Sequence, residues 1–181
     1  MIHILKNGGS LLLVLFSALL STPSVQSQED LIYNGSLKVG AYEGNAMYYY
    51  NIVDGDTILN GPFRMQRSNL GALLEKKDNT FSFTGNFEND YPTGEWRFQF
   101  GQFKSDSLTR VDGYQYKINV SGTQQESKGS MLSGKPDGTW TFVKNQIENS
   151  EIEATLFKSS IEFDKGIPQK SFQIENEEST L

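Results

Sequence analysis

The chain has 181 residues and no cysteine, and its 22 acidic residues outnumber 16 basic ones, for a formal net charge of −6. The lack of cysteine excludes disulfides and thiol chemistry. An acidic chain without a basic cluster is a poor candidate for binding nucleic acid or anionic membranes.

Residues 1–27 are predicted to be a secretory signal peptide. Lys6 supplies the positive charge, Leu11–Leu20 is a short apolar run, and small residues follow at Ser24 and Ser27. A run of this length is too short to cross a bilayer, which needs about 20 apolar residues. We therefore expect export to the periplasm or medium, cleavage near Ser27 and no stable membrane anchor. Loss of Lys6 changes the net charge from −6 to −7.

Period-two alternation dominates residues 28–175 and predicts a single all-β domain of antiparallel strands. Examples are Met47–Ile52, Trp96–Phe100 and Tyr114–Val120. Turn signals separate these strands and stand at Asn34-Gly35, Asp54-Gly55, Asn89 to Gly94, Asp112-Gly113, Gly134 to Gly138 and Lys165-Gly166.

Four segments are expected to depart from this rhythm. Ser68–Lys77 has a possible N-cap and apolar spacing for one or two helical turns. Gly101 is expected to form a bulge that returns Phe103 to the inner face. Gln124–Lys128 is predicted to be a polar loop, and the acidic residues 176–181 are predicted to be a disordered tail.

A five-residue pattern, Gly-x-aromatic-x-apolar, recurs at Gly61–Met65, Gly94–Phe98 and Gly138–Phe142. In the last two copies a Pro-x-Gly sequence precedes the aromatic residue and predicts a turn with positive φ at the glycine. A degenerate copy ends the chain. The predicted anchors of the repeat are Gly61, Phe63, Gly94, Trp96, Phe98, Gly138, Trp140, Phe142 and Phe172. We expect Trp96 and Trp140 in equivalent buried positions.

The unit Gly-x-Phe-x-x-x-x-Pro-x-Gly-x-Trp-x-Phe, seen at Gly85–Phe98 and in variant form at Gly129–Phe142, resembles MORN-type repeats. It is most similar to a degenerate variant in exported bacterial proteins, in a family often labelled antitoxin. The resemblance covers about residues 40–175. It implies an elongated, curved antiparallel sheet of stacked β-hairpins with scaffold or binding roles and no intrinsic catalysis.

The residues needed for most catalytic sites are missing after cleavage. The only histidine, His3, lies in the predicted signal peptide, so Ser-His-Asp and Cys-His mechanisms and the usual zinc sites are excluded. We predict no catalytic residue, metal or cofactor. The carboxylate pairs Asp54/Asp56 and Glu88/Asp90 suit a glycosidase or a calcium site, or else they are solvated turn residues.

Consecutive tyrosines on a strand must point to both faces. A tyrosine beside Tyr42 is therefore expected either in an exposed stacking platform or in an ordinary cross-strand pair. With the anchor aromatics in the core, the opposite face is left for a partner. The predicted binding residues on that face are Tyr49, Arg64, Arg97, Gln99, Lys117 and Thr141.

The leading hypothesis is an exported, non-catalytic binding or scaffold module of the cell envelope that contacts a protein or a glycan. One alternative is an immunity or antitoxin protein that binds a secreted toxin. Another is a carboxylate-dependent glycan hydrolase, which would need two carboxylates buried in a concave site.

Overall fold

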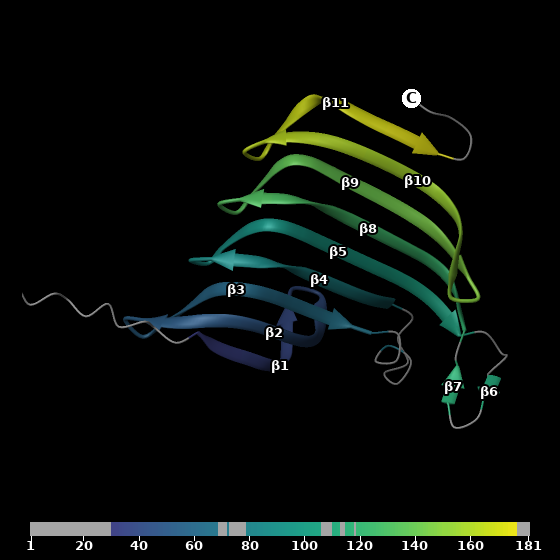
Figure 1. Cartoon of the computed structure of the whole chain (residues 1–181), viewed down its shortest axis with the longest axis horizontal. Helices are drawn as coiled ribbons and strands as arrows, with labels where there is room; N and C mark the ends of the chain where they lie inside the picture. Colours follow the sequence, from purple (N-terminus) through teal and green to yellow (C-terminus); the bar gives the residue numbers. More distant parts are fainter. Residues whose placement is uncertain are drawn as a thin grey trace, which may run out of the picture.

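The computed structural model describes residues 30–68, 72, 79–105, 110–112, 115–117 and 119–176, so the predicted signal peptide lies outside it. A nine-stranded antiparallel sheet with the order β1-β2-β3-β4-β5-β8-β9-β10-β11 makes up most of this part (Figure 1). The strands of this sheet are β1 Leu31–Val39, β2 Tyr42–Val53, β3 Asp56–Arg67, β4 Asn79–Glu88, β5 Tyr91–Ser105, β8 Val120–Leu132, β9 Lys135–Glu148, β10 Glu151–Asp164 and β11 Ile167–Asn176.

The prediction of an all-β antiparallel meander is confirmed. One hairpin stands apart from the sheet, because β6 (Arg110–Asp112) and β7 (Gln115–Lys117) pair only with each other. The predicted single strand over 114–120 is therefore wrong. Only its last residue, Val120, belongs to the large sheet, where it begins β8.

Two-residue turns close most of the hairpins. Both residues have positive φ in Asp54-Gly55, Asn89-Asp90, Ser133-Gly134, Asn149-Ser150 and Lys165-Gly166. Turns of this hand follow the right-handed twist of the flanking strands. The turns predicted at Pro92-Thr93-Gly94 and Asn34-Gly35 are wrong, because the first segment lies within β5 and the second within β1.

The Pro-x-Gly segments form bulges instead of reversing the chain. Thr84 pairs with Arg97 and Asn86 pairs with Thr93, so residues 94–96 of β5 lie opposite Gly85 alone. In the hairpin β8–β9, residues 138–140 lie in the same way opposite Gly129. The predicted positive φ is confirmed, at +67° for Gly94 and +69° for Gly138.

The hairpins β2–β3 and β10–β11 have the same register shift, opposite Tyr49 and Glu162 respectively. Four hairpins thus share the same register shift. The sequence repeat therefore corresponds to a hairpin with this shift. Successive units are also joined at their turns. The amide of Asp90 donates to the carbonyl of Leu59 at 2.9 Å, that of Gly134 to Pro92 at 2.9 Å, and that of Gly166 to Pro136 at 2.7 Å.

One row of residues crosses the sheet through all these bulges, and we name it the central row. From β1 to β11 it consists of Tyr33, Tyr48, Phe63, Gly85, Trp96, Gly129, Trp140, Ile161 and Phe172. A Cβ on Gly85 would overlap the ring of Trp96, and a Cβ on Gly129 would overlap the ring of Trp140. Each tryptophan therefore lies on a glycine of the preceding strand, which explains why the repeat begins with glycine.

The core gathers near the N-terminal end of the sheet, on the face of the central row. Ala46, Met65 and Phe81 are its buried centre. The hairpin β1–β2 crosses β3 in the view of Figure 1 and places Tyr42 against Phe81, with ring centroids 5.3 Å apart. The same ring also lies within 5.7 Å of two further phenylalanines of β4 and β5.

Burial decreases along the central row from β5 to β11. Trp96 is 5% exposed, whereas Trp140 is half-buried and Phe172, on the edge strand, is 63% exposed. The two tryptophans occupy equivalent positions as predicted, but their expected equal burial is wrong. Phe172 matches the other anchors in register but is not packed like them, because β11 is the edge strand of the sheet that the described residues form.

Three other expectations meet the structure at the ends of strands. Gln124–Lys128 is not a loop, since it pairs with both neighbours inside β8. Glu175 and Asn176 belong to β11, one residue beyond the predicted domain end. Of the predicted helical segment only Ser68 and Ala72 are described, and the amide of Ala72 donates to the Ser68 carbonyl at 2.9 Å, as in one helical turn. Among the described residues no helix is long and apolar enough to cross a membrane.

Candidate functional site on the polar face

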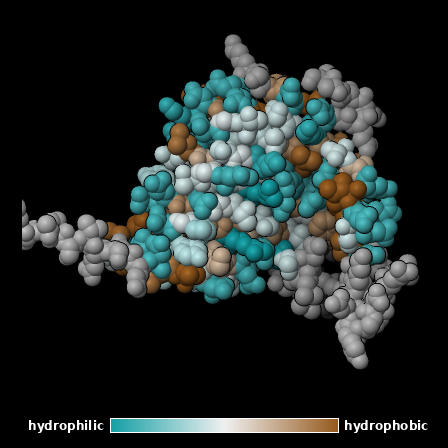
Figure 2. Space-filling model, viewed as in Figure 1, coloured by the Kyte–Doolittle hydropathy of each residue, from teal (hydrophilic) through white to brown (hydrophobic). Residues whose placement is uncertain are grey.

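Strand alternation places a second set of residues on the face opposite the central row. One row on this face, the polar row, consists of Asn34, Met47, Arg64, Thr84, Arg97, Lys128, Thr141, Ser160 and Gln173. In agreement with this composition, the face seen in Figure 2 is largely hydrophilic at its centre and has hydrophobic side chains nearer its rim.

The structure brings together most of the predicted binding residues. Arg64, Arg97 and Thr141 share the polar row, and Tyr49 lies on the same face of β2. Gln99 lies two residues from Arg97 on this face. Lys117 is different, because it belongs to β7 in the separate two-stranded sheet, so its prediction as part of this face is wrong.

A parallel row beside the polar row carries amide and hydroxyl groups, and we name it the amide row. It consists of Asn45, Gln66, Ser82, Gln99 and Glu126. Arg64 donates to Oε1 of Gln66 from Nε at 3.1 Å and from Nη2 at 2.5 Å. Nε2 of Gln99 donates to Oε2 of Glu126 at 2.6 Å, and Nε of Arg97 lies 4.0 Å from the other oxygen of this carboxylate.

These charged partners determine the orientation of the two glutamine amides. A guanidinium can only donate, so the atom of Gln66 that Arg64 contacts must be the carbonyl oxygen. An ionised carboxylate can only accept, so the atom of Gln99 that contacts Glu126 must be the amide nitrogen. The amide nitrogen of Gln66 and the amide oxygen of Gln99 make no hydrogen bond within the described residues. A ligand therefore meets one donor and one acceptor held by charged neighbours.

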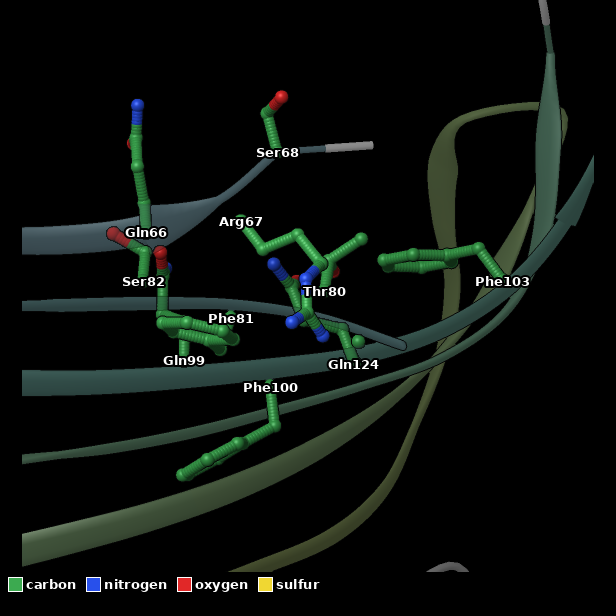
Figure 3. Close-up of a pocket in the computed structure, with 11 residues that line it drawn as sticks. Gln66, Arg67, Ser68, Thr80, Phe81, Ser82, Gln99, Phe100, Phe103 and Gln124 are labelled. Atoms are coloured by element: carbon green, nitrogen blue, oxygen red, sulfur yellow. The ribbon is translucent and has the colours of Figure 1, made fainter. Parts of the chain in front are cut away.

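A pocket of about 180 Å³ lies where the amide row meets the ends of β3, β4, β5 and β8 (Figure 3). Its lining is mainly uncharged and polar, with one aromatic ring on the polar face. The lining residues are Gln66, Arg67, Ser68, Thr80, Phe81, Ser82, Gln99, Phe100, Gly101, Phe103 and Gln124. Figure 3 shows Gln66 and Ser68 projecting to one side of the strands, whereas Phe100 projects to the other.

Phe103 forms one wall of this pocket and extends toward Thr80 and Gln124 (Figure 3). A Cβ on Gly101 would overlap the Phe103 ring, so the ring lies directly over this glycine. The predicted bulge at Gly101 is wrong, because the pairing with β8 continues without a shift from Gly94 to Ser105. Gly101 and Phe103 therefore point to the same face, and Phe103 lies on the polar face instead of the inner one.

Arg67 is the one charged residue that lines the pocket, and its hydrogen bonds hold neighbouring strands together. It is 8% exposed. Its guanidinium donates from Nη2 to the carbonyl of Glu43 at 2.6 Å and from Nη1 to Oδ1 of Asn79 at 3.3 Å, and it lies 5.4 Å from the centroid of Phe81. These contacts connect β2, β3 and β4, so we interpret Arg67 as a structural residue.

The carboxylates considered for catalysis lie on turns. Asp54, Asp56, Glu88 and Asp90 are all exposed. Oδ1 of Asp90 accepts a hydrogen bond from the amide of Leu59 at 2.7 Å, which joins two hairpins. Within the described ranges, no group of three or more His, Cys, Asp or Glu side chains is placed to hold a metal ion.

The tyrosines form a cross-strand pair and do not make an exposed platform. Tyr33 and Tyr48 are direct partners, and their rings stack at 4.8 Å with an interplanar angle of 17°. Burial raises the pKa of Tyr48, and the neighbouring Tyr33 and Tyr50 raise it further. Tyr49 is half-buried on the opposite face of β2, beside Gly61.

Sequence reasoning missed Gln66 and Gln124 as possible ligand contacts. Gln66 stands two residues from Arg64, so strand alternation alone placed it on the same face as a predicted binding residue. Gln124 was missed because its segment is polar throughout and gives no alternation signal, although it is a paired strand.

Comparison with protein-family models, with curated proteins and with solved structures found no significant match.

Proposed function

We propose that this protein is an exported, non-catalytic binding or scaffold module of the cell envelope, and that its polar face contacts a protein or glycan partner. The observation that carries the proposal is the difference in side-chain composition between the two faces of the sheet. The central row and its neighbours place most of the described aromatic side chains on one face, and the other presents Arg64, Arg97, Gln99 and Lys128. The predicted signal peptide at residues 1–27 supports export.

The exposed carboxylates favour this proposal over a glycan hydrolase. A glycosidase holds two carboxyl groups on either side of the scissile bond and raises the pKa of the acid by its surroundings. Asp54 and Asp56 lie at one hairpin turn and Glu88 and Asp90 at another, and all four are exposed. None of these four residues lines the pocket of Figure 3 or two other pockets formed by described residues of β2 to β8.

Capture of partners from an envelope extract tests the proposal. The mature chain, starting after Ser27, is immobilised, and bound proteins and glycans are identified by mass spectrometry. In the variant Tyr49→Ala/Arg64→Ala/Arg97→Ala, each substitution should change the free energy of unfolding by no more than about 0.5 kcal/mol, because these side chains contribute little to the core. It should nevertheless lose the captured partner.

A matched control on the opposite face separates loss of the contact surface from general damage. Gln102 and Lys104 are exposed on β5 and alternate with Gln99 and Phe103. The variant Gln102→Ala/Lys104→Ala should keep the partner. Retention of the partner by the triple variant would contradict the proposal, as would capture of nothing by the parent. A secreted toxin among the captured proteins would instead favour the immunity alternative.

A further inference from the structure

We propose that the pocket at the end of the amide row binds one uncharged sugar unit of a neutral glycan. This inference rests on the proposed binding function and names the class of ligand. It is carried by three features of the pocket: the oriented amides, the ring of Phe103 and the small number of charged groups in the lining.

The amides provide the hydrogen-bonding pattern that sugar hydroxyls require. Each hydroxyl both donates and accepts, so a sugar ring with several hydroxyls can be met by a donor at one position and an acceptor at another. Gln66 presents its amide nitrogen and Gln99 its amide oxygen, because Arg64 and Glu126 occupy the other atom of each amide. Ser82 of β4 lies between these two glutamines, so their backbones are two strand spacings, about 10 Å, apart along the amide row. The charged partners thus orient the amides before any ligand arrives, which lowers the entropic cost of binding.

The second feature is an aromatic wall beside the amides. Sugar rings have apolar faces of C–H groups, which pack on aromatic rings while their hydroxyls point sideways to polar groups. Phe103 supplies such a ring next to Thr80 and Gln124. The ring packs directly on Gly101, which leaves no room for a Cβ there, so the backbone of β5 limits the movement of the ring on that side.

The third feature is charge. The glutamines, serines and threonine of the lining are neutral, and the only ionic side chain in it is Arg67. Arg67 is buried and bonded to Glu43 and Asn79, so its cation already serves the strand contacts. A neutral ligand loses little on entering such a site. Arg64 beside Gln66 and Glu126 beside Gln99 carry opposite charges, and each is already bonded to a glutamine, so the pocket offers an acidic sugar no net positive charge.

The volume of the pocket determines how many sugar rings it can enclose. Sites that enclose a drug-sized molecule have volumes of about 300–1,000 Å³. At about 180 Å³ this pocket is smaller, so a single ring fits while the rest of the chain lies on the surface. The polar row continues from there across the neighbouring strands and gives the remaining sugar units polar contacts.

Titration of the isotope-labelled mature protein with oligosaccharides, followed by NMR, tests this inference. The probes are cellohexaose, laminarihexaose, mannohexaose and the hexamer of N-acetylglucosamine, each neutral. At least one should shift the side-chain amide signals of Gln66, Gln99 and Gln124 in a saturable manner. For that sugar, Gln99→Ala and Phe103→Ala should each weaken binding by about tenfold.

Matched variants exclude an indirect effect of folding. Gln102→Ala on β5 and Gln125→Ala on β8 change glutamines on the face of the central row, opposite Gln99 and Phe103. Both should leave the affinity for the sugar unchanged. Phe103→Trp should retain binding because it keeps an aromatic face, whereas Phe103→Leu keeps a packed apolar side chain and should lose it. Thermal unfolding of each variant verifies that it is folded.

The inference is overturned if none of the four probes binds, if polygalacturonate binds more tightly than all of them, or if the Gln99 and Phe103 variants bind as well as the parent. These outcomes are distinct from failure of the proposed function. Capture of an envelope protein through Arg64 and Arg97, without any sugar binding, would uphold the proposed function and reject the sugar site alone.

Discussion

The hairpins β4–β5 and β8–β9 carry the same sequence frame and the same bulge, yet they differ in burial. Trp96 is 5% exposed, and its ring contacts Phe63 at 5.9 Å, Phe87 at 5.3 Å and Phe98 at 5.7 Å. Trp140 is half-buried, and among described rings it stacks only on Phe98, at 6.2 Å. The repeat therefore determines where each tryptophan lies, whereas the neighbouring hairpins determine how much of it is buried.

The indole nitrogen of the less buried tryptophan is the one that makes a hydrogen bond. Nε1 of Trp140 donates to the carbonyl of Ser130 at 2.9 Å. Nε1 of Trp96 is buried and has no hydrogen-bond partner among the described residues. An unmade hydrogen bond of this kind costs about 1–3 kcal/mol, so the better packed copy also carries the less satisfied polar atom. Packing and polar satisfaction are thus distributed differently between two units that look alike in sequence.

The largest expected effect is on the tryptophans themselves. Trp96→Ala should destabilise the fold by about 3–5 kcal/mol because it empties a closely packed site. Trp140→Ala should cost less, about 2 kcal/mol, since part of that ring is already in contact with water. Urea unfolding of both variants measures the difference. Equal losses of unfolding free energy in the two variants would mean that the difference in burial has no effect on stability.

A smaller effect is expected beneath the rings. Gly85→Ala and Gly129→Ala each place a methyl group against a tryptophan, and such overpacking costs about 1–3 kcal/mol. Gly85→Ala should be the more harmful, because Trp96 is held on several sides and has less room to move. Tryptophan fluorescence during urea unfolding reports both stability and any displacement of the ring. A larger cost at Gly129 would contradict the comparison.

The bulge glycines should give the smallest and most equal effects. Gly94 and Gly138 have nearly the same positive φ, and a Cβ at either would have no neighbour within 4 Å. Alanine at each position should cost about 1 kcal/mol from backbone strain alone. Asparagine, which tolerates this conformation, should cost less than alanine. Unequal losses at the two sites, measured by thermal unfolding, would show that the bulge is not a shared local unit.

The sequence predicted the features that depend on near neighbours in the chain. Alternating side chains predicted the all-β class. The Pro-x-Gly sequences predicted the positive φ of Gly94 and Gly138, and the repeated frame predicted that Trp96 and Trp140 are equivalent. It misplaced the turns because Pro92-Thr93-Gly94 suits a bulge as well as a turn. Only the pairing with β4 decides between the two.

The tertiary structure alone decided what depends on distant segments. Burial of Trp96 depends on rings from two other strands, Phe63 of β3 and Phe87 of β4, and exposure of Phe172 follows from its place on β11 at the edge of the sheet. Residues 124–128 lack apolar alternation, so their pairing on both sides was not predictable locally. The pocket gathers Gln66, Gln99 and Gln124 from three strands, because cross-strand register places residues far apart in sequence side by side.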